Sequence, residues 1–145
     1  MALAQKKDPY SQYKKTEIDT ANQGKLIVML YDGAIKFLNI AVENMSIKTY
    51  DIVNTNIIKA QDIITELLIS LNMKDGGEIS TNLFNLYLYF KKRLLEANIQ
   101  KNADIIKEVI DHMKVLRNAW DKISAKENMT DPGKIASKGS FSIEG

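Results

Sequence analysis

The amino-acid sequence predicts an all-α protein: an antiparallel up-down four-helix bundle with a flexible N-terminal arm and a disordered C-terminal tail. Three observations lead to this fold class. Apolar residues recur at alternating steps of three and four along four stretches of about twenty residues each, which is the spacing of one helix face. No stretch alternates between apolar and polar residues for long enough to indicate a β-strand. The connections between the stretches are short, and short connections make neighbouring helices antiparallel.

The first two helices follow residues that suit helix N-termini. The first helix is expected over about residues 22–45, because a long apolar-periodic stretch follows Asn22, a favourable N-cap residue. The second is expected over about residues 49–72, with Thr49 as its N-cap. Asp51 would then lie near the positive end of the helix dipole, where a carboxylate is favourable.

The last two helices are separated from the first two by the segment 74–77, which contains two glycines and breaks the apolar pattern. The third helix is expected over about residues 79–99. The fourth would be capped by Asn102 and end near Ser124. The sequence therefore predicts an arm over residues 1–20, a bundle over 21–124 and a polar tail over 125–145.

Two of the helices carry one regular apolar stripe each. The stripe of the second helix consists of Val53, Ile57, Ala60, Ile64, Leu67 and Leu71. The stripe of the fourth helix consists of Ile106, Val109, Met113, Leu116, Trp120 and Ile123. Polar residues occupy the opposite side of the fourth helix, so it is expected to bury a single face in the bundle.

The first helix carries more apolar surface than one core face uses. Its polar sector consists only of Asp32, Lys36, Asn39 and Glu43. We expect its core face to consist of Leu26, Leu30, Gly33, Phe37, Ile40 and Ala41. A second ridge then remains, made of Ile27, Val28, Tyr31, Ile35, Leu38 and Val42. Beside the expected core residues of the third helix (Leu83, Leu86, Phe90 and Leu94), Phe84, Leu88 and Leu95 form a smaller excess. In the second helix, Ile58 and Ile69 lie nearly opposite the core stripe.

Two interpretations account for this excess of apolar residues. Bundle helices commonly bury an arc wider than 100°, so the ridges could extend the core. Alternatively, they form a binding surface, since large apolar patches on soluble proteins mark interaction sites and apolar grooves accept amphipathic helices. We predict that the ridges serve at least partly in binding. The candidate binding residues are Ile27, Tyr31, Ile35, Leu38, Val42, Ile58, Ile69, Phe84, Leu88 and Leu95.

The composition argues against several classes of function. The chain has 145 residues, no cysteine and one histidine, which excludes a thiol nucleophile, a cysteine-based metal site and a multi-histidine metal site. Its 20 basic and 18 acidic residues are too balanced for a bulk nucleic-acid binder. The longest unbroken apolar run, residues 26–31, is far shorter than the ~20 residues of a membrane span. We therefore expect a cytoplasmic protein with no cofactor, no metal, no nucleic-acid partner and no stable membrane insertion.

A histidine phosphotransfer domain is the alternative function. Such domains are also four-helix bundles with one exposed histidine on a helix, and His112 lies on the fourth helix near the edge of its apolar stripe. The residues that follow, Met113-Lys114, lack the glycine expected after a phosphorylated histidine. Glu108 and His112 are four residues apart and do not form the Glu-x-x-His pair of di-iron bundles. We expect no catalytic residue here.

Several segments together resemble the flagellar export chaperone FliS family. They are DPYSQY at 8–13, MLYDGAIKFL at 29–38, KAQDIITEL at 59–67, GGEISTNLFNLYLYFKKRLLEAN at 76–98 and LRNAWDKI at 116–123. The resemblance covers about residues 8–124, and the segments agree with the family in order and spacing. It implies a helical bundle that binds the poorly ordered C-terminal region of flagellin, prevents premature polymerisation and delivers the subunit to the flagellar type III export gate.

The same resemblance implies a role for the N-terminal arm. Tyr10, Tyr13 and Ile18 are its only apolar anchors, and the arm resembles a family segment that can lie against the bundle. We predict that it covers part of the binding groove when no client is bound. A homodimer that uses the extra ridges as a self-interface is left open by the sequence.

Overall fold

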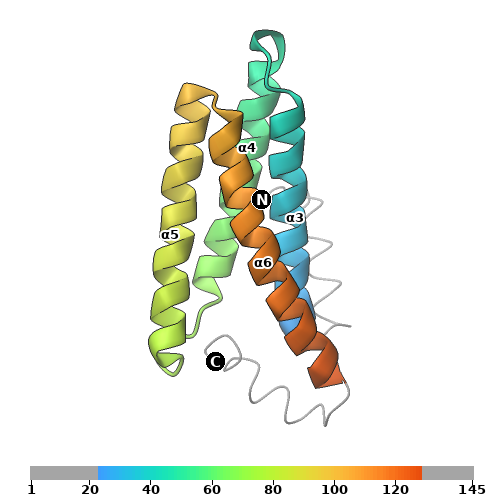
Figure 1. The fold of residues 1–145 in the computed structure, drawn as a ribbon. Helices are drawn as coiled ribbons and strands as arrows, with labels where there is room; N and C mark the ends of the chain where they lie inside the picture. The colour runs from blue at the N-terminus through green and yellow to red at the C-terminus, as the bar shows by residue number, and fades with distance from the viewer. Residues whose placement is uncertain (1–22, 129–145) are drawn as a thin grey trace, which may run out of the picture.

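The computed structural model of the protein describes residues 23–128, which form four long α-helices and one short 3-10 helix (Figure 1). The helices are α3 (Gln23–Glu43), α4 (Tyr50–Ile69), α5 (Gly77–Gln100) and α6 (Ala103–Asn128), and η1 (Ile47–Thr49) joins α3 to α4. This part of the chain contains no strand, so the predicted all-α fold class is confirmed. The arm expected over residues 1–20 and the tail beyond residue 128 lie outside the described residues.

The four helices form a ring in which each one packs against two neighbours. Helix α3 lies between α4 and α6, and α5 lies between the same two helices on the opposite side. Consecutive helices run in opposite directions along the bundle (Figure 1). Short connections impose this arrangement, because a chain that turns within a few residues must return beside the helix it has left. The predicted up-down topology is confirmed.

Helix α4 begins one residue after Thr49, the predicted N-cap. Thr49 occupies the N-cap position, but its side chain makes no capping hydrogen bond. Its Oγ1 instead donates a hydrogen bond to the carbonyl oxygen of Asn44 at 2.6 Å, which closes the connection from α3. Asp51 lies in the first turn of α4 as predicted, where its carboxylate complements the helix dipole.

Helix α6 begins at the cap that the sequence predicts and ends later than expected. Asn102 Oδ1 accepts hydrogen bonds from the backbone N–H of Asp104 at 2.9 Å and from that of Ile105 at 3.3 Å. The helix continues to Asn128, beyond the predicted end at Ser124. The added turn contains alanine, lysine and glutamate, which are strong helix formers, so the local sequence favours it.

Two glycines shape the turn that leads into α5. Gly77 has φ +60°, a left-handed conformation that glycine adopts without a Cβ penalty. At Gly76, a Cβ atom would overlap the Oγ of Ser80 and the carbonyl oxygen of Asn72. The buried Ser80 Oγ donates to that same carbonyl at 3.0 Å. Helix α5 therefore starts at residue 77, two residues before the predicted start.

The core stripe predicted for α4 is buried along its whole length, so that prediction is confirmed. The stripe predicted for α6 is buried from Ile106 to Met113 and at Trp120, but Leu116 is half-buried and Ile123 is 39% exposed. The prediction for α6 is therefore wrong at Ile123. The bundle core narrows toward the C-terminal end of this helix.

Helix α3 is turned relative to the orientation that the sequence predicts. Its buried side chains include Ile27, Val28, Tyr31 and Leu38, all from the predicted second ridge. Of the predicted core face, Leu30 and Ala41 are buried, whereas Leu26, Gly33, Phe37 and Ile40 are half-buried. Projected at 100° per residue, the buried face lies about a quarter turn from the predicted one. The predicted polar sector is exposed throughout, so the error concerns which of two apolar faces points inward.

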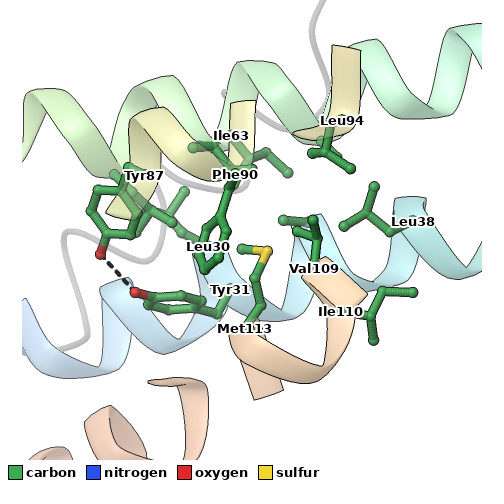
Figure 2. Close-up of a cluster of buried hydrophobic side chains, with 14 of the residues drawn as sticks. Leu30, Tyr31, Leu38, Ile63, Tyr87, Phe90, Leu94, Val109, Ile110 and Met113 are labelled. Carbon is green, nitrogen blue, oxygen red and sulfur yellow. Dashed lines mark hydrogen bonds between the residues drawn. The ribbon is translucent and has the colours of Figure 1, made fainter. Parts of the chain in front are cut away.

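A pair of buried tyrosines joins two diagonal helices in the core. The hydroxyl groups of Tyr31 on α3 and Tyr87 on α5 are hydrogen-bonded at 2.6 Å (Figure 2). Burial raises the pKa of Tyr87 to about 12 and raises the pKa of Tyr31 well above its ordinary value. Buried hydroxyl groups need partners, and this bond lets two polar groups lie inside an otherwise apolar cluster.

Candidate functional site

The seam between α4 and α5 is closed by polar contacts. Asn98 Nδ2 donates to Asn54 Oδ1 at 2.7 Å, and Gln61 Nε2 donates to the backbone carbonyl of Lys91 at 3.1 Å. The ammonium group of Lys91 reaches back to the hydroxyl oxygen of Thr65. These bonds fix the register of the two antiparallel helices, with Asn54 level with Asn98 and Gln61 level with Lys91.

Exposed apolar side chains stand along this polar seam. Ile58 lies four residues after Asn54 and three before Gln61, and Leu95 lies four after Lys91 and three before Asn98, so both face the seam. Ile69 and Leu88 continue the two rows toward the other end of the helices. The exposed fractions are 44% for Ile58, 71% for Ile69, 45% for Leu88 and 54% for Leu95. We call these four residues the α4/α5 rim.

Several other candidate binding residues lie inside the bundle. Ile27, Tyr31 and Leu38 are buried in the core, so in this conformation they have no surface to offer a partner. Ile35, Val42 and Phe84 are half-buried and pack against the core. The sequence expectation that helix α3 presents the exposed ridge is therefore corrected: α4 and α5 present it. The arm residues Tyr10, Tyr13 and Ile18 lie outside the described part of the chain.

Sequence reasoning missed two extensions of the apolar surface. Ile99 on α5 is 75% exposed and follows Leu95 by four residues, so it prolongs the rim. The four-residue spacing between Leu95 and Ile99 is a signal in the sequence that could have identified this extension. On α3, the half-buried Leu26, Met29 and Ile40 form a second strip. No sequence signal distinguished that strip from the core face, because both faces of α3 are apolar.

An ion-pair network joins α5 to α6 on another side of the bundle. Arg93 contacts Glu108 at 2.8 Å and Glu96 at 2.6 Å, and the hydroxyl of Tyr89 donates to the second oxygen of Glu108 at 2.7 Å. The hydrogen bond from Arg93, followed by that from Tyr89, lowers the pKa of Glu108. The Glu108 carboxylate and the Tyr89 phenol thus help to hold α5 and α6 together, while Glu96 pairs with Arg93 within α5.

His112 does not sit in a reactive cluster. Its side chain is exposed, and its ring lies 6.0 Å from that of Phe90. Within residues 23–128, no group of three or more histidine and acidic side chains is arranged to hold a metal ion. In the same range, no helix is long and apolar enough to cross a lipid bilayer.

The helical bundle and its exposed apolar rim are the features of an all-α domain that acts by binding another protein. The sequence profile of the family described as "Flagellar protein FliS" matches residues 6–127. The chain belongs to this family. It is therefore a member of a chaperone family and not an enzyme, and family membership gives no support to histidine phosphotransfer.

Curated relatives agree with this assignment. The chain is 34% identical over 120 residues to the flagellar secretion chaperone FliS of Bacillus subtilis, a match that covers 83% of this chain and 89% of the relative. It is 35% identical over 120 residues to the protein of the same name from Salmonella typhimurium, covering 81% and 87% of the two chains. For the Campylobacter jejuni protein the identity is 31% over 125 residues, with coverage of 83% and 94%.

Proposed function

We propose that this protein is a cytoplasmic chaperone that binds the C-terminal region of flagellin, prevents its premature polymerisation and delivers it to the flagellar type III export apparatus. The observation that carries the proposal is the α4/α5 rim, an exposed apolar surface in a chain whose family consists of flagellar secretion chaperones. Export requires a contact with the export gate as well, and that contact is part of the proposal.

The rim suits an amphipathic helix of the client. Ile58 and Ile69 are separated by about 16 Å along α4 at 1.5 Å per residue, which matches three turns of a bound helix. A client that orders on binding loses conformational entropy, and burial of apolar side chains offsets that loss. The rim side chains are already partly buried, so complete burial of each one contributes on the order of 1–2 kcal/mol.

Charges beside the rim give the bound helix a direction. Asp62 follows Ile58 by four residues and is exposed, and Lys92 follows Leu88 by four residues and is exposed. The α4 side of the rim is thus flanked by a carboxylate and the α5 side by an ammonium group. A client helix with basic residues on one edge and acidic residues on the other complements this pattern.

Titration calorimetry with the full chain and a flagellin C-terminal fragment tests the proposal. Binding with a negative heat-capacity change is expected, because the contact buries apolar surface. The double variant Ile58→Ser/Leu95→Ser should weaken binding by about tenfold or more. The matched control is Ile47→Ser, which changes a side chain that is 80% exposed in η1, away from the rim. Absence of binding by the unaltered chain would refute the proposed function.

The same rim is the surface through which two copies of the chain would pair. If a homodimer forms through it, the flagellin fragment competes with the second copy. Light scattering after size exclusion, with and without the fragment, measures this directly. Dissociation of a dimer by the fragment indicates a shared surface, whereas a dimer that survives saturation with the fragment uses another one.

A further inference from the structure

The core face of α5 becomes uncovered toward its N-terminal end. Phe90 and Leu94 are fully buried, Leu83 and Leu86 are half-buried, and Ile79 is 48% exposed. These five residues are spaced by three and four and therefore belong to one stripe. Ile79 is exposed because no neighbouring helix covers this end of the stripe, although the stripe itself points toward the bundle interior.

Helix α6 shows the same change toward its C-terminal end. Val109 and Met113 are fully buried, Leu116 is half-buried and Ile123 is 39% exposed. Trp120, on the same stripe, remains 5% exposed. The side chains nearest the axis of the bundle thus stay covered, while those on the side that faces α5 do not.

Both uncovered segments lie at one end of the bundle, since α5 and α6 are antiparallel. The contacts that join the two helices are made in their other halves, by Arg93 and Tyr89 with Glu108. Farther along, α6 diverges from α5 and lies along α3 (Figure 1), where Arg117 pairs with Asp32 at 2.8 Å. Apolar side chains of both helices are exposed or half-buried at this end, and we call this set of residues the α5/α6 opening: Ile79, Leu83, Leu86, Leu116 and Ile123.

The segment that follows α6 starts at this opening. Helix α6 forms one wall and ends at Asn128, so residues 129–145 continue from the same end of the bundle. An extended chain from Met129 to Phe141 spans up to about 40 Å. The distance back along α6 from Asn128 to Leu116 is only about 18 Å. The segment also lies beyond residue 127, where the family match stops, so it is not part of the shared bundle.

We propose that residues 129–145 fold back onto the α5/α6 opening, with Phe141 and Ile143 as the apolar anchors. In an extended segment, alternate side chains point to the same side, so both anchors can enter the opening while Ser142 faces outward. Tethering places the anchors at a local concentration on the order of millimolar. The same segment of a second copy of the chain is not tethered, so its concentration near the opening is only that of the protein in solution. The N-terminal arm also starts at this end of the bundle, where α3 begins (Figure 1), and its occupancy of the opening would leave a label on residue 142 without localised broadening.

A spin label tests this docking in the full chain. The protein has no cysteine, so Ser142→Cys gives a single site for a nitroxide. We expect the backbone amide signals of residues 79–86 and 116–123 to lose most of their intensity, and those of residues 47–58, at the other end, to be unaffected. The substitutions Phe141→Ser and Ile143→Ser together should restore the lost signals. Ile135→Ser, an apolar change elsewhere in the segment, should not.

Further variants and a mixing experiment test whether residues 129–145 of the same chain, and not a second copy, occupy the α5/α6 opening. The wall variants Ile79→Ser and Ile123→Ser should reduce the broadening, and Ile47→Ser should leave it unchanged. Even broadening over the whole bundle, or broadening confined to the α4/α5 rim, would overturn the proposal. So would broadening in isotope-labelled protein mixed with separately spin-labelled protein, because that result would identify a second copy. No flagellin is present, so the outcome is independent of the proposed function.

Discussion

Tyr31 and Tyr87 form a hydrogen bond between two helices that are not neighbours in the ring. Their hydroxyl groups are 2.6 Å apart, and both side chains are almost completely buried. The ring centroids are 6.4 Å apart with a 53° angle between the planes, an arrangement typical of aromatic pairs. Because the bond forms only at one axial position, it fixes the height of α3 relative to α5 across the core.

Removal of one hydroxyl from this pair should destabilise the fold. Tyr87→Phe leaves the buried Tyr31 hydroxyl without this partner, and we expect a loss of about 1–3 kcal/mol in the free energy of unfolding. The double variant Tyr31→Phe/Tyr87→Phe should lose less than the sum of the two single variants, since it leaves neither of the two hydroxyls without its partner. Urea unfolding of the three variants measures the coupling, and strict additivity would show that the bond contributes nothing.

The Arg93–Glu108 contact should make stability depend on pH in the acid range. The pKa of Glu108 is lowered from its ordinary value of 4.5 because Arg93, and then Tyr89, hydrogen-bond to the ionised form. Stability from such a group is present above the unfolded-state pKa and is lost as pH falls through the folded-state pKa. The unaltered chain should therefore exceed Glu108→Gln in stability at pH 7, and the difference should shrink below pH 4.5. A difference that persists undiminished in acid would contradict this account.

Two leucines that the sequence assigned to the same binding surface should behave differently. Leu38 is fully buried, whereas Leu95 is 54% exposed. We expect Leu38→Ala to reduce the free energy of unfolding by about 2–5 kcal/mol and Leu95→Ala to change it by about 0.5 kcal/mol or less. Thermal or urea unfolding of the two variants measures this contrast. Equal losses would mean that α3 is not turned as described.

The glycines before α5 should respond to alanine for different reasons. A Cβ at Gly76 overlaps Ser80 and the Asn72 carbonyl, whereas a Cβ at Gly77 meets no atom within 4 Å. Gly77→Ala should cost about 1–2 kcal/mol, since only its positive φ is unfavourable. Gly77→Asn should cost less, because asparagine tolerates that conformation. Gly76→Ala should be the most destabilising of the three by unfolding midpoint, and the reverse order would argue against this turn geometry.

Deletion of residues 1–18 examines the predicted role of the arm. The helical content should be retained, because the described core is formed by residues 27–120. If the arm covers the half-buried strip of α3, deletion should raise the binding of a fluorescent apolar probe, and it should raise the affinity for the flagellin fragment if the fragment contacts this strip as well as the α4/α5 rim. The deletion of residues 129–145 serves as a comparison. If neither the affinity for the fragment nor the binding of the probe changes, the arm does not cover this apolar surface.

Much of the fold could be predicted because it depends on local signals. The helix boundaries follow caps and breakers, such as the Asn102 amide and the glycines at 76 and 77, and these act within a few residues. The α4 stripe was unambiguous because its opposite side is mainly polar. The extra turn of α6 was missed because the composition beyond Ser124 indicated a tail, although its first residues favour a helix.

The candidate surface was predicted only in part. Ile58, Ile69, Leu88 and Leu95 were identified as apolar side chains outside the core stripes, and their exposure agrees with that placement. Ile27, Tyr31 and Leu38 were assigned to the wrong side of α3. Periodicity reports that two apolar faces exist on a helix, but it contains no information about which face meets a neighbour.

The sequence by itself determined the number and order of the helices and their approximate bounds, since hydrogen bonds and caps along one segment decide these features. It also showed an excess of apolar residues that a single stripe per helix does not use. Only the tertiary structure decided where the excess lies. Helix α3 packs against two helices and buries Tyr31 against Tyr87, so its rotation depends on partners more than 50 residues away. Side-chain packing across the core therefore decided which apolar face of α3 is buried. The exposed apolar rim lies on α4 and α5.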